Sequence, residues 1–137
     1  MSDVVANPYI NFQGQTREAM EFYQRALGGK LELTAFSEDG TPREAGPDDR
    51  VMHAMLVVGG MRIMGSDGHP DYPPTVGDNM AIALYGTDRE FLTTAFDKLP
   101  EGGTVMQALK TESWGDSFGY FVDKYGINWM VNINGQQ

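Results

Sequence analysis

The sequence contains no cysteine among its 137 residues and only two histidines. The absence of cysteine excludes disulfide bonds, thiolate nucleophiles and metal centres with cysteine ligands. Basic residues are also scarce, since 10 lysines and arginines stand against 19 aspartates and glutamates and the net charge is −9. This balance argues against nucleic acids and anionic membrane surfaces as partners, because both require a basic protein surface.

Long apolar runs are missing as well. No stretch approaches the roughly 18 apolar residues of a membrane-spanning helix, and residues 1–8 lack the basic start and apolar run of a signal peptide. The hydrophobic fraction of 41% is typical of a folded domain. We therefore expect a single soluble, cytoplasmic domain that folds without a metal or a disulfide.

The apolar pattern predicts the same order of elements twice, each time one helix and four strands. Module 1 (about 8–66) is expected to contain a strand, a helix and three strands over 9–13, 16–27, 30–36, 51–58 and 61–66. Module 2 (about 80–134) is expected to contain the same series over 80–85, 91–99, 104–109, 118–122 and 129–133. A proline-rich connector over 67–79 joins the modules, and residues 37–49 are expected to be a polar loop. Thr16 and a capping box beginning at Thr87 are the expected helix caps.

With one helix for four strands, each module covers one face of its sheet and leaves the other face open. Two such modules side by side would form a curved mixed sheet whose concave face encloses a cavity. We therefore predict an α+β fold built from two βαβββ modules in one domain.

Several short segments are similar to those of PhnB-like proteins: Pro8–Phe12, Glu18–Tyr23, Leu27–Gly29, Val51–Ala54, Ile63–Asp67, Trp114–Gly115 and, most specifically, Asp123–Asn132. PhnB-like proteins form a branch of the vicinal oxygen chelate superfamily, which includes glyoxalase I, extradiol dioxygenases and bleomycin and fosfomycin resistance proteins. The resemblance implies the glyoxalase fold, a ligand site in the concave sheet, and a homodimer or a closely paired two-module unit. PhnB-like sequences also resemble sequences labelled as 3-demethylubiquinone methyltransferases, but this chain lacks the glycine-rich loop that a common methyltransferase fold requires.

Metal-dependent members of the superfamily hold a divalent ion through His and Glu at four positions. Carried onto this chain, these positions fall at Asn7 or Pro8, Met64, Met80 or Ala81, and Met130. None of them offers an imidazole or a carboxylate, and thioethers suit Cu(I) at most. The resemblance therefore implies that this chain lacks the superfamily metal site, and we expect no metal and no cofactor.

His53 is the first candidate for chemistry, because it shares a strand face with Met55 while Leu56 lies on the face expected to pack on the helix. It would act as an acid, a base or a hydrogen-bond donor in the cavity, or it is a partly buried structural histidine. His69 lies between Asp67 and Asp71, a spacing that suits either a metal ligand or, more commonly on such a loop, turn hydrogen bonds.

Met64 and Met130 occupy equivalent hairpin positions and are expected in the pocket floor, whereas the other strand methionines are expected mostly in the core. Asn132 is expected beside Met130, where it orients a polar ligand or faces solvent. Trp114, in a loop near Phe118, either stacks on a ligand at the cavity mouth or forms a hydrophobic plug at a dimer interface.

These features predict a PhnB-like protein that binds a small organic ligand in an apolar cavity without a metal. Two alternatives remain open: a lyase, isomerase or dioxygenase of the superfamily, with a metal or with His53 alone, and a resistance protein that sequesters a drug. The sequence names neither the ligand nor whether the modules pair within one chain or across a dimer.

Overall fold

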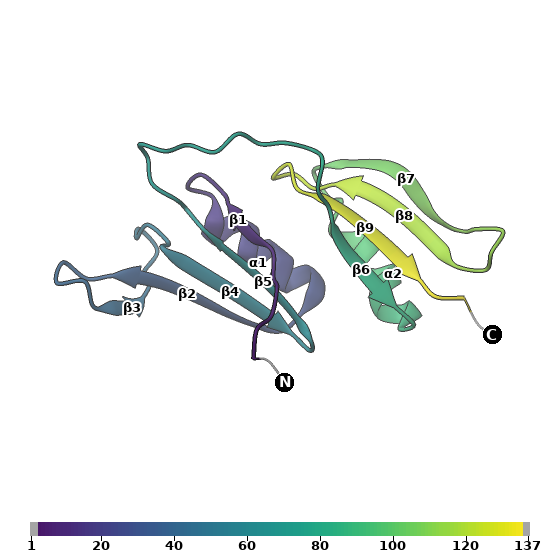
Figure 1. The fold of residues 1–137 in the computed structure, drawn as a ribbon, viewed down its shortest axis with the longest axis horizontal. Helices are drawn as coiled ribbons and strands as arrows, with labels where there is room; N and C mark the ends of the chain where they lie inside the picture. Colours follow the sequence, from purple (N-terminus) through teal and green to yellow (C-terminus); the bar gives the residue numbers. More distant parts are fainter. Residues whose placement is uncertain (1–2, 136–137) are drawn as a thin grey trace. The chain divides into compact units, whose positions relative to one another are not determined.

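The structure, a computed structural model, describes residues 3–135 and divides into two compact units, with the boundary between Thr75 and Val76 (Figure 1). Unit 1 contains β1 (Tyr9–Asn11), α1 (Thr16–Leu27), β2 (Lys30–Phe36), β3 (Pro42–Glu44), β4 (His53–Val58) and β5 (Met61–Ser66). Unit 2 contains β6 (Ile82–Gly86), α2 (Arg89–Lys98), β7 (Thr104–Thr111), β8 (Ser117–Val122) and β9 (Asn128–Ile133). No helix within residues 3–135 has both the length and the apolar composition that crossing a membrane requires.

The two sheets share one strand order. The sheet of unit 1 runs β1-β5-β4-β2-β3 and that of unit 2 runs β6-β9-β8-β7. In each sheet the first strand of the unit pairs in parallel with the last strand, and the described neighbours beyond that pair are antiparallel. The predicted α+β fold with mixed sheets is therefore confirmed.

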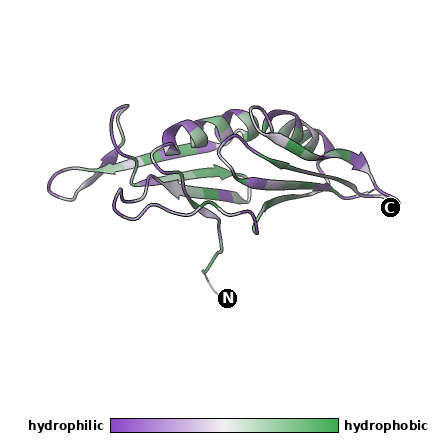
Figure 2. Cartoon of the chain, turned by 90° about the horizontal axis from the view of Figure 1, so that it is seen from above, coloured by the Kyte–Doolittle hydropathy of each residue, from purple (hydrophilic) through white to green (hydrophobic). Residues whose placement is uncertain are grey.

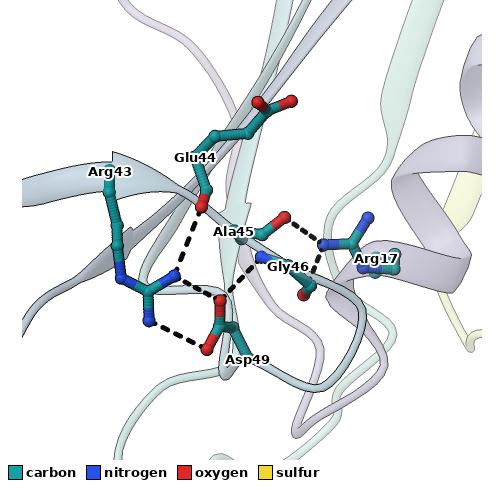
Figure 3. A network of polar contacts seen from close by, with 6 residues as sticks. All are labelled: Arg17, Arg43, Glu44, Ala45, Gly46 and Asp49. Carbon is teal, nitrogen blue, oxygen red and sulfur yellow. Dashed lines mark hydrogen bonds and ion pairs between the residues drawn. The ribbon is translucent and has the colours of Figure 1, made fainter.

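The prediction that residues 37–49 form a plain polar loop is wrong, because they include β3, which pairs antiparallel with the end of β2. The loop after β3 is folded back by Asp49, which accepts from both terminal nitrogens of Arg43 at 2.5 and 2.9 Å and from the Gly46 amide at 2.6 Å (Figure 3). The Arg43 hydrogen bonds, followed by the Gly46 amide, lower the pKa of Asp49 to about 2. Arg17 of α1 donates to the Gly46 carbonyl as well and ties the loop to the helix.

In each unit the helix lies on one face of its own sheet (Figure 2). The buried face of α1 includes Met20 and Tyr23, both fully buried, and it packs on the alternate residues of β4 and β5 that point towards it, Ala54, Leu56 and Ile63. Each large side chain buried in this way contributes about 1.5–3 kcal/mol. The intervening residues of the same strands point to the face that carries no helix.

In unit 2, α2 packs mainly on β6 and β9. Trp129, Val131 and Ile133 are fully buried beneath it, as the alternation of β9 predicts. Phe96 of α2 meets Phe121 edge-on, with ring centroids 5.2 Å apart. β7 lies at the sheet edge beyond this cover, and its residues are almost all exposed.

Both helix caps differ from the sequence prediction. The first amide of α1, that of Thr16, donates to the buried carboxylate of Asp67, which lies beyond β5 in the chain. The cap of α2 is Asp88 instead of Thr87, and its side chain accepts from the Phe91 amide. An aspartate from a distant segment replaces the local cap because the parallel pairing of β1 with β5 brings that segment to the start of α1.

The expectation that the strand methionines other than Met64 and Met130 lie mostly in the core is also wrong. Met80, Met106 and Met52 are 81%, 62% and 36% exposed. Met80 and Met52 precede their strands, and Met106 lies on β7, which α2 does not cover. Met20 of α1 is fully buried.

Candidate functional site

Several of the predicted site residues lie on the sheet faces that carry no helix, called here the open faces. On the open face of unit 1, Met64 of β5 stands between Met55 of β4 and Tyr9 of β1, with all three in register. Met55 and Met64 are half-buried, and Tyr9 is 54% exposed. The ring of His53 lies 6.1 Å from that of Tyr9. The sequence prediction missed Tyr9 as a site residue, although its alternation with Ile10 places it on this face.

The first two superfamily metal positions meet on this open face. The Asn7 side-chain amide lies 3.9 Å from the sulfur of Met64, whereas Pro8 uses its carbonyl to accept the Met64 amide. The register therefore assigns the first position to Asn7. An amide and a thioether are not the donors that Zn, Ni, Mn or Fe(II) sites use in this superfamily pattern, so the residues present do not fit such an ion.

The other two metal positions lie in unit 2. Met130 of β9 is opposite Ala83 of β6. Ala83 is thus the equivalent of Tyr9, which is opposite Met64 in unit 1. Asn7 lies two residues before Tyr9 and Ala81 lies two residues before Ala83, so the register assigns the third position to Ala81. A methyl group and a thioether again do not suit a divalent ion. Within residues 3–135, no three side chains of the His, Cys, Asp or Glu type come together to hold a metal.

The open face of unit 2 is lined by aromatic side chains. Tyr120 lies opposite Met130, and Phe118 lies opposite Asn132, all four half-buried. The side-chain nitrogen of Asn132 donates to Asp116 at 3.1 Å, which fixes the orientation of the amide. The sequence prediction grouped Phe118, Met130 and Asn132 but omitted Tyr120, which the alternation of β8 places beside Phe118.

Trp114 lies in the loop that joins β7 to β8 and is 67% exposed. The same loop carries Asp116, whose pKa is lowered by the Gly135 amide, then by the side chains of Asn132 and Trp114. Trp114 is too exposed to be part of the core of unit 2.

In the Asp67–His69–Asp71 cluster only His69 makes the expected turn hydrogen bond, whereas Asp67 binds amides that are distant in the sequence. Both carboxylate oxygens of Asp67 accept backbone amides, from Thr16 at 3.0 Å and Val51 at 2.8 Å. His69 uses its Nδ1 atom to accept the Asp71 amide at 3.1 Å. The side chains of Asp67 and His69 therefore bind backbone amides, and an Asp71 carboxylate oxygen lies 3.7 Å from His69 Nδ1.

The most specific motif of the resemblance, beginning at Asp123, proves to build a turn. One oxygen of Asp123 accepts the amides of Tyr125 and Ile127, at 2.8 and 3.0 Å, and the other accepts the indole N–H of Trp129 at 2.8 Å. Asp123 and Trp129 are both buried. This motif thus fixes the β8–β9 hairpin and the position of the neighbouring Met130.

A family model described as 3-demethylubiquinone-9 3-methyltransferase matches residues 5–132. The chain belongs to this family. Protein YjdN of Escherichia coli (strain K12) is 30% identical over 143 residues, which cover 96% of each chain. The crystal structure of protein PA1353 from Pseudomonas aeruginosa is 37% identical, with a TM-score of 0.81 over 98% of this chain and 100% of that one.

The family description recurs on a solved structure from Bacillus cereus, a putative 3-demethylubiquinone-9 3-methyltransferase called PhnB protein, which is 23% identical. Its TM-score is 0.72 over 95% of this chain and 99% of that one, a likeness of fold alone. Structures described as glyoxalase/bleomycin resistance protein/dioxygenase share the fold too. The glyoxalase fold that the resemblance to PhnB-like proteins implies is therefore confirmed. Each described sheet of this PhnB-like protein has one parallel pair, unlike the doubly wound sheet of common methyltransferases.

Proposed function

We propose that this PhnB-like protein binds a small organic molecule on the open faces of its sheets, without a metal. The observation that carries the proposal is the row of Tyr9, Met64 and Met55, which stand side by side across three strands on a face that no helix covers. Methionine adapts to the shape of a ligand, and sulfur–aromatic contacts favour flat rings. A row of this kind is suited to an aromatic or otherwise unsaturated ligand.

The donor atoms at the four superfamily positions support binding without a metal. Asn7, Met64, Ala81 and Met130 offer an amide, two thioethers and a methyl group, where a metal-dependent relative would need imidazoles and carboxylates. Metal analysis of protein purified without chelator tests this part. Sub-stoichiometric Ni, Zn and Mn is the expected result, and one equivalent of any of them would contradict the proposal.

The binding proposal is tested with a neutral aromatic dye, N-phenyl-1-naphthylamine, whose fluorescence rises in an apolar environment. We expect saturable binding that Met64→Glu weakens about tenfold or more, because the variant places a charge where the dye would rest. Met106→Glu is the matched control, since Met106 is 62% exposed on β7. Absence of saturable binding, or equal weakening by both variants, would refute the proposal.

Catalysis by His53 receives no support from its surroundings. A catalytic histidine is normally oriented by a carboxylate or another hydrogen-bonding group. His53 meets the ring of Tyr9, and within residues 3–135 it has no hydrogen bond or ion pair through its side chain. Turnover of a hemithioacetal or a catechol that is lost in His53→Ala would favour an enzyme instead.

The homodimer and the cytoplasmic location stay predictions that derive from the family resemblance and the composition. We propose both as the setting in which the ligand is bound. Light scattering coupled to size-exclusion chromatography measures the first, and a mass of 15.1 kDa, that of one chain, would refute it.

A further inference from the structure

Two cations lie next to the apolar row on the open face of unit 1. Val57 of β4 is opposite Lys30 of β2 on one side and Arg62 of β5 on the other. Lys30 and Arg62 precede Glu32 and Met64 by two residues, so they share the open face with Met55 and Met64. Both cations are exposed. The open face of unit 1 thus has a cationic row beside an apolar one.

Lys30 and Arg62 differ from most other cations of this acidic chain. Polar partners engage Arg17, Arg43, Arg50 and Arg89, and aromatic rings engage Arg25 and Lys124. Neither the Lys30 nor the Arg62 side chain has a hydrogen bond, an ion pair or a ring contact within residues 3–135. Although the chain has 19 acidic residues, these two neighbouring cations have no carboxylate partner, so they are available to a negative charge from outside the chain.

Arg62 is better placed than Lys30 to bind a negatively charged group. Its register neighbour is Val57 and the next residue on its own face is Met64, neither of which is charged. Glu32 also lies on this face, opposite Met55 and two residues from Lys30, and it offsets part of the charge of Lys30. β4 separates Glu32 from Arg62.

We infer that the ligand of unit 1 is an organic anion, whose apolar body lies on Tyr9, Met64 and Met55 and whose acidic group binds Arg62, with Lys30 in support. This inference rests on the proposed function. Residues two apart on one strand are separated by roughly 6.6 Å. That spacing matches a fused aromatic ring with a carboxylate, sulfonate or phosphate attached. The guanidinium group suits such planar or multidentate oxyanions.

The sheet of unit 2 also places a cation next to an apolar side chain. Lys110 of β7 lies opposite Phe118 of β8, which lies opposite Asn132 of β9. Like Arg62, Lys110 has no polar partner within residues 3–135. The open face of each unit thus carries a cation near apolar or aromatic side chains.

A matched pair of dyes tests the inference. 8-Anilinonaphthalene-1-sulfonate is N-phenyl-1-naphthylamine with a sulfonate added, so the two differ in the anionic group alone. We expect Arg62→Gln to weaken binding of the sulfonate dye about tenfold or more, as the loss of a charge-assisted hydrogen bond would, and to change binding of the neutral dye less than about twofold. Arg62→Lys should recover part of the lost affinity.

Arg25→Gln removes the same charge from the surface of α1 and is the control for net charge. The inference is overturned if Arg62→Gln and Arg25→Gln weaken the sulfonate dye equally, or if Arg62→Gln weakens both dyes equally. Failure of the neutral dye to bind the wild-type protein overturns the proposed function itself. The two failures are therefore distinguishable in one set of titrations.

Discussion

Replacing Asp123 with alanine removes three hydrogen bonds at once, because its carboxylate accepts the amides of Tyr125 and Ile127 and the indole N–H of Trp129. A hydrogen bond to a charged group contributes about 1.5–3 kcal/mol. Three such contributions add up to about 5–9 kcal/mol. The actual loss is smaller, because water reaches the freed amides of the half-buried Tyr125 and Ile127 and because the turn relaxes. The fully buried indole loses its partner outright. We therefore expect Asp123→Ala to lower the free energy of unfolding by about 3–5 kcal/mol.

Trp129 makes this loss directly measurable. It is fully buried and stacks on Phe121 with the ring planes 6° apart, so its fluorescence reports unfolding of unit 2. With a urea dependence of about 1.5 kcal/mol per molar, the midpoint should fall by about 2–3 M. Asp97→Ala, at an exposed position of α2, is the control. A loss below about 1 kcal/mol in Asp123→Ala would refute the account of this turn.

Three further predictions concern the fold. Asp67→Ala should increase hydrogen exchange at the Thr16 and Val51 amides by at least tenfold, whereas a substitution of the exposed Asp71 should not. The Asp49 carboxyl should titrate at about pH 2 in NMR spectra. Its contribution to the free energy of unfolding is present above its ordinary pKa of 3.8 and should be lost as the pH falls through about 2. An unchanged pKa of Asp49 in Arg43→Gln would contradict the assigned cause. Gly119→Ala should lower the free energy of unfolding of unit 2 by about 1–3 kcal/mol, because the added methyl group would lie 2.5 Å from the Phe96 ring. Urea unfolding measures this loss, and a variant as stable as the wild type would contradict this packing.

The order of elements was predictable from the sequence because apolar alternation is a local signal. In β9, the alternation of Trp129 and Val131 with Met130 predicts which side chains meet the helix, and the structure buries the first two. The helix of module 1 was predicted with the correct bounds, since its stripe of apolar residues ends at a pair of glycines with positive φ, Gly28 and Gly29.

Features that depend on contacts distant in sequence were not predictable. β3 was missed for a different reason, because it pairs with the neighbouring β2 but its polar residues carry no apolar alternation. The cap of α1 comes from Asp67, some fifty residues along the chain from Thr16. A local pattern such as Thr16 followed by acidic residues suggests a cap by itself, and the true one depends on which strands pair.

The candidate site was predictable in part for the same reason. Alternation placed His53 and Met55 together, and the equivalence of the two hairpins pointed to Met64. The adjacency of Tyr9 and Met64, and of Arg62 with Lys30 across Val57, depends on the register between strands that are far apart in sequence. The sequence alone does not fix that register, so the cationic row escaped prediction.

The pairing of β7 with β8 shifts register between Val105 and Gln107 and again between Gln107 and Lys110. At a sheet edge with such interruptions the free amides and carbonyls are not regularly spaced, so a strand from another molecule cannot form a continuous set of hydrogen bonds with it. Exposed Val105 and Met106 would otherwise make this edge a starting point for amyloid-like stacking. The irregular pairing thus makes the β7 edge a poor template for the addition of a strand from another molecule.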